Sequence, residues 1–100
     1  MSQTIYNVLF LCADNSARSI LAEAILNNLA AEKGRFKAYS AGSVPENQIN
    51  SFALEKIRSA GLPSFGLHSK NWNEFIAPDA PRMHFVFMVG EEIATKQFPI

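Results

Sequence analysis

Apolar residues along the chain follow two different periods, which together predict a protein of alternating strands and helices. Three short runs are rich in apolar, β-branched and aromatic residues, as is typical of strands buried on both faces of a parallel sheet. These runs cover Ile5–Leu11, Phe36–Ala41 and Phe85–Val89, and the second is the weakest of the three. We expect them to form the strands of one sheet.

Between these runs, apolar residues recur at spacings of three and four, which predicts amphipathic helices. One helix is expected to begin near Arg18 and end before Gly34, with an inward face made of Ile20, Leu21, Ala24, Ile25, Asn28 and Leu29. A second should cover about Asn50–Ala60, with Phe52, Ala53, Ile57 and Ala60 on one face. Shorter helical segments are expected at Trp72–Phe75 and Glu91–Gln97.

The order of these elements predicts an α/β fold. Right-handed crossovers between successive strands would make the sheet parallel and place helices on both faces, which is a three-layer αβα architecture. In such sheets, ligands bind beyond the carboxyl ends of the strands. The segment Cys12–Ser19 leaves the first strand at that edge, so we expect the functional site there.

Composition narrows the class of protein further. One hundred residues predict a single domain, 1–100, and nine basic side chains balance nine acidic ones. No basic cluster points to nucleic acid, and no apolar run is long enough to span a membrane or to act as a signal peptide. The single cysteine, Cys12, excludes an intramolecular disulfide and fits a reducing cytoplasm.

The loop from Cys12 to Ser19 has the chemistry of an oxyanion site. It ends at the expected start of a helix, where unpaired N–H groups and the helix dipole favour an anion. The backbone N–H groups available for this role belong to Ala13, Asp14, Asn15, Ser16, Ala17 and Arg18. The Arg18 guanidinium can donate two parallel hydrogen bonds to such an anion, and the same field favours the thiolate of Cys12. Ser19 could donate to that thiolate, and the Asn15 amide could brace the loop.

A structural interpretation of the same residues competes with this one. A lone cysteine at the end of a buried strand can be a small core side chain, and Arg18 can be a solvated helix residue. Asp14 would oppose an anion if its carboxylate faced the ligand, whereas a carboxylate facing solvent would leave the site unaffected. Asp79 lies between prolines and is read as a turn residue rather than an acid catalyst. His68 and His84 lack partners at metal-ligand spacing, so we predict no metal.

The loop and several later motifs resemble a known family. The segments that carry the resemblance are Val8–Ala24, Tyr39–Ser43, Gly66–Lys70 with Trp72 and Glu74–Phe75, and Phe85–Val89. The first is similar to the start of low-molecular-weight protein tyrosine phosphatases and the related arsenate reductases, and the third is more similar to the reductase branch. The resemblance implies that Cys12 is the nucleophile, that Arg18 and Ser19 assist it, and that Ser40 with Asn15 supports the loop.

The chain also departs from this family. Family members continue past this point with an Asp-Pro loop carrying the general acid, a further strand and a last helix, so the resemblance implies a chain truncated at its C-terminus. Gly90 and Phe98 stand about where thioredoxin-coupled reductases carry resolving cysteines. An internal thiol relay is therefore excluded, and the reductant would be an external thiol such as glutathione, glutaredoxin or thioredoxin, with no bound cofactor.

Three functions follow from these observations as hypotheses. The first is an arsenate reductase-like enzyme in which Cys12 attacks a bound arsenate and an external thiol completes the reduction. The second is a low-molecular-weight phosphatase that hydrolyses phosphomonoesters through a phosphocysteine at Cys12. The third is an oxyanion-binding remnant with impaired catalysis. The missing strand also predicts exposed apolar surface at the sheet edge, which a homodimer would cover.

Overall fold

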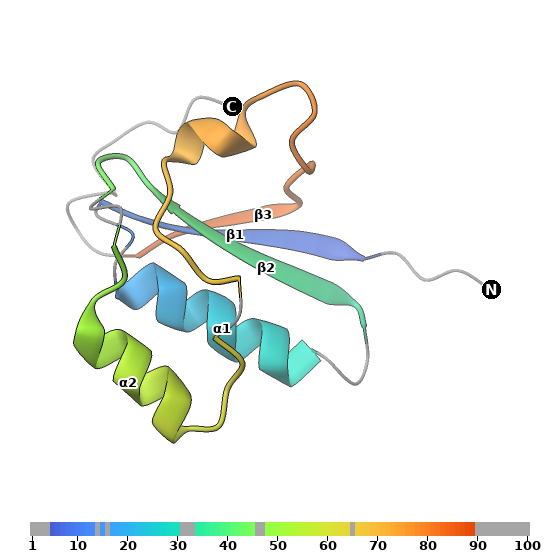
Figure 1. The fold of residues 1–100 in the computed structure, drawn as a ribbon. Helices are drawn as coiled ribbons and strands as arrows, with labels where there is room; N and C mark the ends of the chain where they lie inside the picture. The colour runs from blue at the N-terminus through green and yellow to red at the C-terminus, as the bar shows by residue number, and fades with distance from the viewer. Residues whose placement is uncertain are drawn as a thin grey trace.

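The described part of the chain forms a parallel sheet between two unequal layers. The computed structural model describes residues 5–13, 15, 17–30, 34–45, 48–64 and 66–89. Its strands are β1 (Tyr6–Cys12), β2 (Phe36–Gly42) and β3 (Phe85–Met88), and its helices are α1 (Arg18–Ala30), α2 (Ser51–Ser59) and the 3₁₀ turn η1 (Trp72–Phe75). Helices α1 and α2 lie on one side of the sheet and η1 on the other (Figure 1). The α/β prediction and the element order are confirmed. The helix expected at Glu91–Gln97 lies outside the described residues.

The sheet order is β2-β1-β3, and both pairings are parallel. In the β1–β2 register, the last pair joins Cys12 to Gly42. The backbone of Asn71 bridges to Gly42 as well, which adds the segment before η1 to the same edge. The carboxyl ends of β1 and β2 and the segment around Asn71 therefore meet at one place.

Two apolar clusters hold the layers together. On the η1 side, Leu9 and Leu11 of β1 pack with Ala41 and Phe75, and Trp72 covers the edge of this cluster. Ile20 and Ala24 of α1 pack against Ile57 of α2 in the second cluster. Fully burying one such leucine or isoleucine contributes about 1.5–3 kcal/mol. The first cluster therefore holds η1 on the sheet, and the second holds α2 against α1.

The polar ends of α2 explain where that helix begins. The side-chain oxygen of Asn50 accepts hydrogen bonds from the backbone nitrogens of Phe52 and Ala53 at 2.9 and 3.1 Å, as an N-cap does. Only Ala53 and Ile57 of the face expected from sequence are buried, whereas Phe52 is 75% exposed. The expectations for Phe52 and Ala60 were wrong: Phe52 lies in the first turn of α2 and Ala60 is its C-cap, and both are exposed.

The inward face of α1 is also narrower than its sequence predicts. Ile20 and Ala24 are buried, but Ile25 is 47% and Leu29 71% exposed. Polar side chains take part of the inward face instead: the Asn27 amide accepts from the Ala38 backbone nitrogen at 2.8 Å and donates to its carbonyl at 3.1 Å. This pair of hydrogen bonds fastens α1 to β2.

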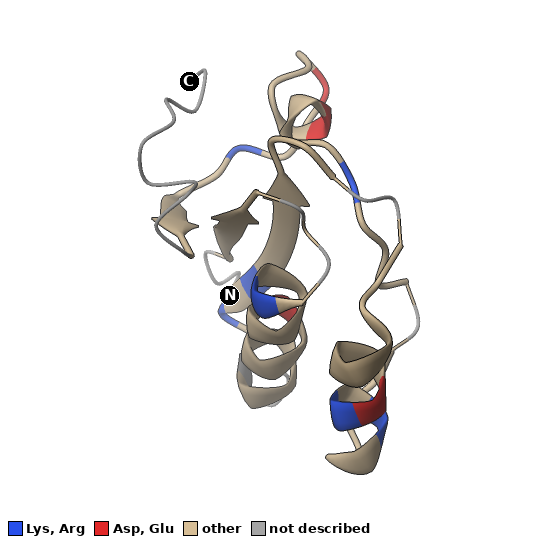
Figure 2. Cartoon of the chain, turned by 90° about the vertical axis from the view of Figure 1, so that its left-hand side faces the viewer, with Lys and Arg blue, Asp and Glu red and all other residues tan. Residues whose placement is uncertain are grey.

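Apolar side chains are exposed on β3 as well. Phe85 and Phe87 are 46% and 51% exposed, and the Phe87 ring stacks on Phe10 with 5.8 Å between centroids. Basic and acidic residues are mixed along the described chain, and α2 carries both kinds (Figure 2).

Among the described residues, no helix is both long enough and apolar enough to cross a membrane.

Candidate oxyanion site

The candidate site lies in the connection from β1 to α1, where the sequence predicted it. Strand β1 ends at Cys12, and α1 begins with the exposed residue Arg18. Of the residues between them, the structure describes Ala13, Asn15 and Ala17, while Asp14 and Ser16 lie outside the described part. The open question of which way the Asp14 carboxylate faces therefore stays a prediction.

The end of β2 fixes the first turn of this loop. The Ala13 carbonyl accepts a hydrogen bond from the Val44 backbone nitrogen at 2.8 Å. A Cβ atom placed on Gly42 would lie 2.6 Å from that carbonyl oxygen and 3.0 Å from the Asn15 backbone nitrogen. Only a residue without a side chain lets the loop approach β2 this closely.

The Cys12 sulfur is enclosed by polar groups of the loop. Cys12 has 0% exposed surface, its Sγ lies 2.9 Å from the Ser19 hydroxyl, and the Asn15 backbone N–H donates to it at 3.2 Å. The sulfur therefore has polar partners although it is buried. The interpretation of Cys12 as a purely apolar core residue does not account for these contacts.

Asn15 organises the loop through a strained backbone and both ends of its amide. Its φ of 48° lies in the left-handed region, and the residue is 0% exposed. The Lys70 backbone N–H donates to Oδ1 at 2.7 Å, which identifies that amide atom as the oxygen. Nδ2 then donates to the Ser19 hydroxyl at 2.8 Å. Ser19 Oγ accepts this bond, so its own hydrogen is available to Cys12 Sγ, which accepts it when the sulfur is a thiolate.

A buried ion pair lies one step further from the sulfur. Lys70 is 7% exposed; its ammonium donates to the carbonyls of Ser40 and His68 at 2.9 and 2.8 Å and lies 3.9 Å from a Glu23 carboxylate oxygen. The Ser40 hydroxyl donates to the same carboxylate oxygen of Glu23 at 2.6 Å. Ser40, expected as loop support, binds this pair, and Lys70 in turn contacts Asn15 of the loop. Its role as loop support stays a prediction.

Burial perturbs both members of this pair. Burial raises the pKa of the Glu23 carboxyl, although the Ser40 hydrogen bond and the charges of Lys70 and His68 oppose the shift. Burial likewise lowers the pKa of Lys70, against the charges of Glu23 and Glu74. In each group the cost of removing a charge from water outweighs the attraction of its partner.

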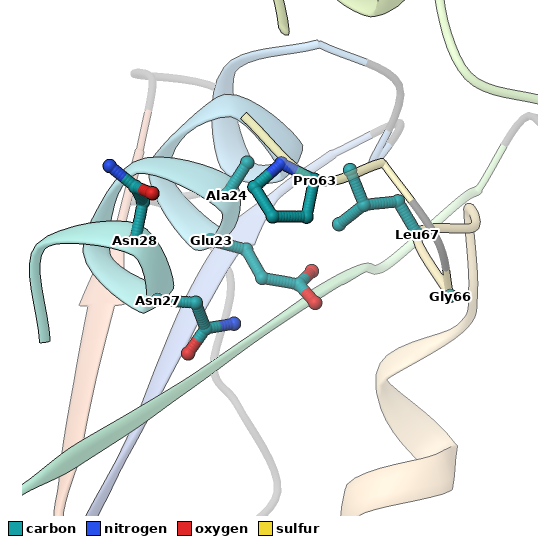
Figure 3. A pocket seen from close by; sticks show the side chains of 7 residues that line it. All are labelled: Glu23, Ala24, Asn27, Asn28, Pro63, Gly66 and Leu67. Atoms are coloured by element: carbon teal, nitrogen blue, oxygen red, sulfur yellow. The ribbon is translucent and has the colours of Figure 1, made fainter. Parts of the chain in front are cut away.

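A cavity gives access to the carboxylate end of the pair. It has a volume of about 250 Å³ and opens between α1 and the segment that carries Pro63 and Leu67. Glu23 extends from α1 toward that segment (Figure 3). The cavity lies along the second turn of α1, so it is separate from the loop that surrounds Cys12.

The remaining residues singled out from sequence lie elsewhere. Asp79 is exposed in a turn that the Ala80 nitrogen closes onto the Ala77 carbonyl. His84 is exposed, and its Nδ1 accepts from the Asn7 backbone nitrogen at 2.9 Å. No group of histidine, cysteine, aspartate or glutamate side chains in the described ranges has the arrangement of a metal site.

Comparison with known proteins identifies the family of the chain. A sequence model described as low molecular weight phosphotyrosine protein phosphatase matches residues 7–92. The chain belongs to this family. No curated protein sequence matches it.

Solved structures share the family fold. The crystal structure of YfkJ from Bacillus subtilis is 29% identical, with a TM-score of 0.78 over 94% of this chain and 61% of that one. The low molecular weight protein tyrosine phosphatase from T. tengcongensis is 28% identical, with a TM-score of 0.68 over 83% and 57%. An arsenate reductase in the phosphate binding state is also 28% identical, with a TM-score of 0.63 over 76% and 56%. The chain thus spans less than two thirds of the length of these proteins.

The sequence did not reveal Glu23 and Lys70 as parts of the site. One signal for Glu23 was present: it lies three residues after Ile20 and four before Asn27, on the face of α1 that turns inward. A carboxylate at such a position needs a buried partner. No pattern in the chain identifies Lys70 as that partner.

Proposed function

We propose that the chain is an arsenate reductase-like thiol enzyme that binds a tetrahedral oxyanion in the loop Cys12–Ser19. The support is the pair of hydrogen bonds that converge on Cys12 Sγ, from the Asn15 backbone and the Ser19 hydroxyl. Backbone N–H groups of Ala13, Asp14, Asn15, Ser16, Ala17 and Arg18 would face the oxyanion, together with the Arg18 guanidinium. No cofactor is required for this chemistry.

The proposed reaction has two steps that exchange electrons between sulfur and arsenic. The Cys12 thiolate attacks arsenic, a sulfur–arsenic bond forms, and one oxygen leaves as water after taking up a proton. An external thiolate then attacks the Cys12 sulfur, a mixed disulfide forms, and arsenic departs as arsenite with the electron pair of the broken bond. Arsenic(V) is thereby reduced to arsenic(III), and a second external thiol restores Cys12 by disulfide exchange.

Arsenite release tests this proposal. Arsenate, glutathione and a glutaredoxin should yield arsenite with the wild-type chain and none with Cys12→Ser. Ser59→Ala, at the exposed end of α2, is the matched control and should leave the rate unchanged. Equal rates from the wild type and Cys12→Ser would refute the proposal.

A second candidate is hydrolysis of phosphomonoesters through a phosphocysteine at Cys12. The support is the similarity to the T. tengcongensis phosphatase at 28% identity. General acid catalysis is typically worth about 10²–10⁴ in rate, and the only described aspartate, Asp79, is exposed in a turn. Turnover of para-nitrophenyl phosphate without arsenite release would favour this candidate. Binding of phosphate in a calorimeter with neither turnover would indicate an oxyanion-binding remnant.

We also propose that the chain forms a homodimer through β3, the edge strand of the sheet in the described part of the chain. The exposed rings of Phe85 and Phe87 support this, because a second copy would remove them from water. Light scattering at increasing concentration should show a dimer, and Phe87→Ser should shift it toward monomer. A wild-type chain that stays monomeric throughout would overturn the dimer.

A further inference from the structure

We propose that Lys70 is a positioning residue for Cys12, because its anchored backbone orients the Asn15 amide and thereby directs the Ser19 hydroxyl toward the sulfur. The hydrogen bonds of Lys70 reach Asn15, Ser40 and His68, so its proposed route to the sulfur runs through Asn15. The proposal rests on the proposed role of Cys12 as nucleophile, and it adds a residue 55 positions away from the loop that holds the sulfur.

The side chain of Lys70 anchors its own backbone at two points. Its ammonium bonds to the carbonyl of Ser40 in β2 and to that of His68, two residues before it in the chain. The Lys70 carbonyl accepts from the Gly42 backbone nitrogen at 2.9 Å. One residue thus joins the 68–70 segment to β2 from both its side chain and its main chain, next to the loop.

The anchored backbone then sets the direction of a chain of hydrogen bonds. The Lys70 N–H can only donate, so Asn15 must turn its oxygen toward Lys70 and its NH₂ group toward Ser19. That choice makes Ser19 an acceptor toward Asn15 and a donor toward Cys12. Without a donor at the position of the Lys70 N–H, the amide could rotate and present its oxygen to Ser19. The hydroxyl would then donate to Asn15, and the sulfur would lose that hydrogen bond.

The stability of the fold does not by itself explain why Glu23 and Lys70 form a buried ion pair next to the loop. An apolar side chain of similar length would fill the space without taking an ammonium and a carboxylate out of water, and replacing buried ion pairs by apolar residues is often neutral or stabilising. Glu23 and Lys70 are 13% and 7% exposed, and both pKa values shift in the direction of destabilised charge. Fixing the geometry next to the sulfur is a role that an apolar residue could not fill.

Alkylation of Cys12 measures this role directly. Because Cys12 is the only cysteine, iodoacetamide reports on one sulfur, and the pH profile of its rate reports on thiolate formation. Lys70→Met keeps the length of the side chain and removes the ammonium. We expect its profile to move to higher pH, with a rate about tenfold lower on the acidic side, as for the loss of one hydrogen bond to a charged group. Lys56→Met, on the exposed side of α2, is the matched control and should keep the wild-type profile.

The profile separates positioning from a purely structural role. If Lys70 only stabilised the fold, Lys70→Met would unfold at lower denaturant concentration and keep the wild-type pH profile, and that result would overturn the proposal. The assay contains no arsenate. Failure of the wild type to release arsenite would therefore refute the proposed function, whereas an unshifted alkylation profile would refute only the role of Lys70.

A measurement on the wild-type chain covers the case in which Lys70→Met does not fold. In ¹⁵N NMR spectra, the Lys70 backbone amide and the Asn15 side-chain amide should shift as Cys12 is titrated. Glu23, His68 and Glu74 also act on this region, and Cys12→Ser removes the sulfur while leaving all three in place. Identical titration of the Lys70 amide in both proteins would overturn the proposal.

Discussion

Asn15 offers the sharpest test of how the loop is built, because two substitutions separate the contributions of its amide and its backbone. The residue has a φ of 48°, is fully buried and uses both ends of its amide. Asn15→Ala removes the amide and keeps a Cβ in the left-handed region. Asn15→Gly removes the amide and relieves the backbone. Asn28→Ala, at an exposed position of α1, is the control.

The expected magnitude follows from these contacts. Leaving the buried Lys70 N–H without its acceptor costs about 1–3 kcal/mol. A Cβ in the left-handed region costs roughly 1–2 kcal/mol, and alanine lacks the local hydrogen bonds that let asparagine tolerate it. We therefore expect Asn15→Ala to lower the free energy of unfolding by about 2–5 kcal/mol and Asn15→Gly by about 1–2 kcal/mol less than that.

Urea unfolding followed by circular dichroism gives these differences directly. The slope against urea should stay constant across the series, since the surface exposed on unfolding hardly changes. Asn28→Ala should remain within about 0.5 kcal/mol of the wild type. The reasoning fails if Asn15→Ala is as stable as the wild type, or if Asn15→Gly is less stable than Asn15→Ala.

Three further outcomes follow from the same structure. Gly42→Ala should slow Cys12 alkylation and cost about 1–3 kcal/mol in urea unfolding, because its Cβ would meet the Ala13 carbonyl at 2.6 Å; a neutral effect would show that the loop is not held against β2. Asn27→Ala should cost about 1–3 kcal/mol, since it leaves two backbone groups of β2 unpaired, and thermal unfolding would reveal it. In Lys70→Met, Glu23 loses its counter-charge, so its folded-state pKa rises further above the unfolded value. Stability is lost as pH rises through a raised folded pKa, so the deficit of Lys70→Met against the wild type should grow as pH rises above the ordinary titration range of a glutamate. A deficit independent of pH in urea titrations would contradict this.

Local patterns in the sequence predicted the secondary structure well because each element is short and its apolar period is clear. Strand β1 was expected at Ile5–Leu11 and lies at Tyr6–Cys12, and η1 lies where one helical turn was expected. Periodicity failed where a helix is only partly covered. Periodicity shows that a helix has an apolar face, but not which part of that face another element covers. It therefore placed Ile25 and Leu29 of α1 inward, although both are exposed.

The contacts of the candidate site could be predicted only for residues that lie close together in the sequence. Cys12, Asn15 and Ser19 lie within eight positions, so their approach follows from a strand that turns into a helix. The Lys70 contact to Asn15 depends on the whole path through β2 and α2. Tertiary packing decides such contacts, and no local pattern encodes them.

The burial of Cys12 should make the protein resistant to oxidation by air. Oxidation of a cysteine, like its alkylation, requires the reagent to reach the sulfur, and Cys12 is fully buried in this structure, so both reactions wait for the loop to open. Cross-linking of two chains through a disulfide would require both sulfurs to leave their loops. Preparations should therefore keep a free thiol during handling without reductant, and any covalent dimer on a gel would signal that the loop has opened.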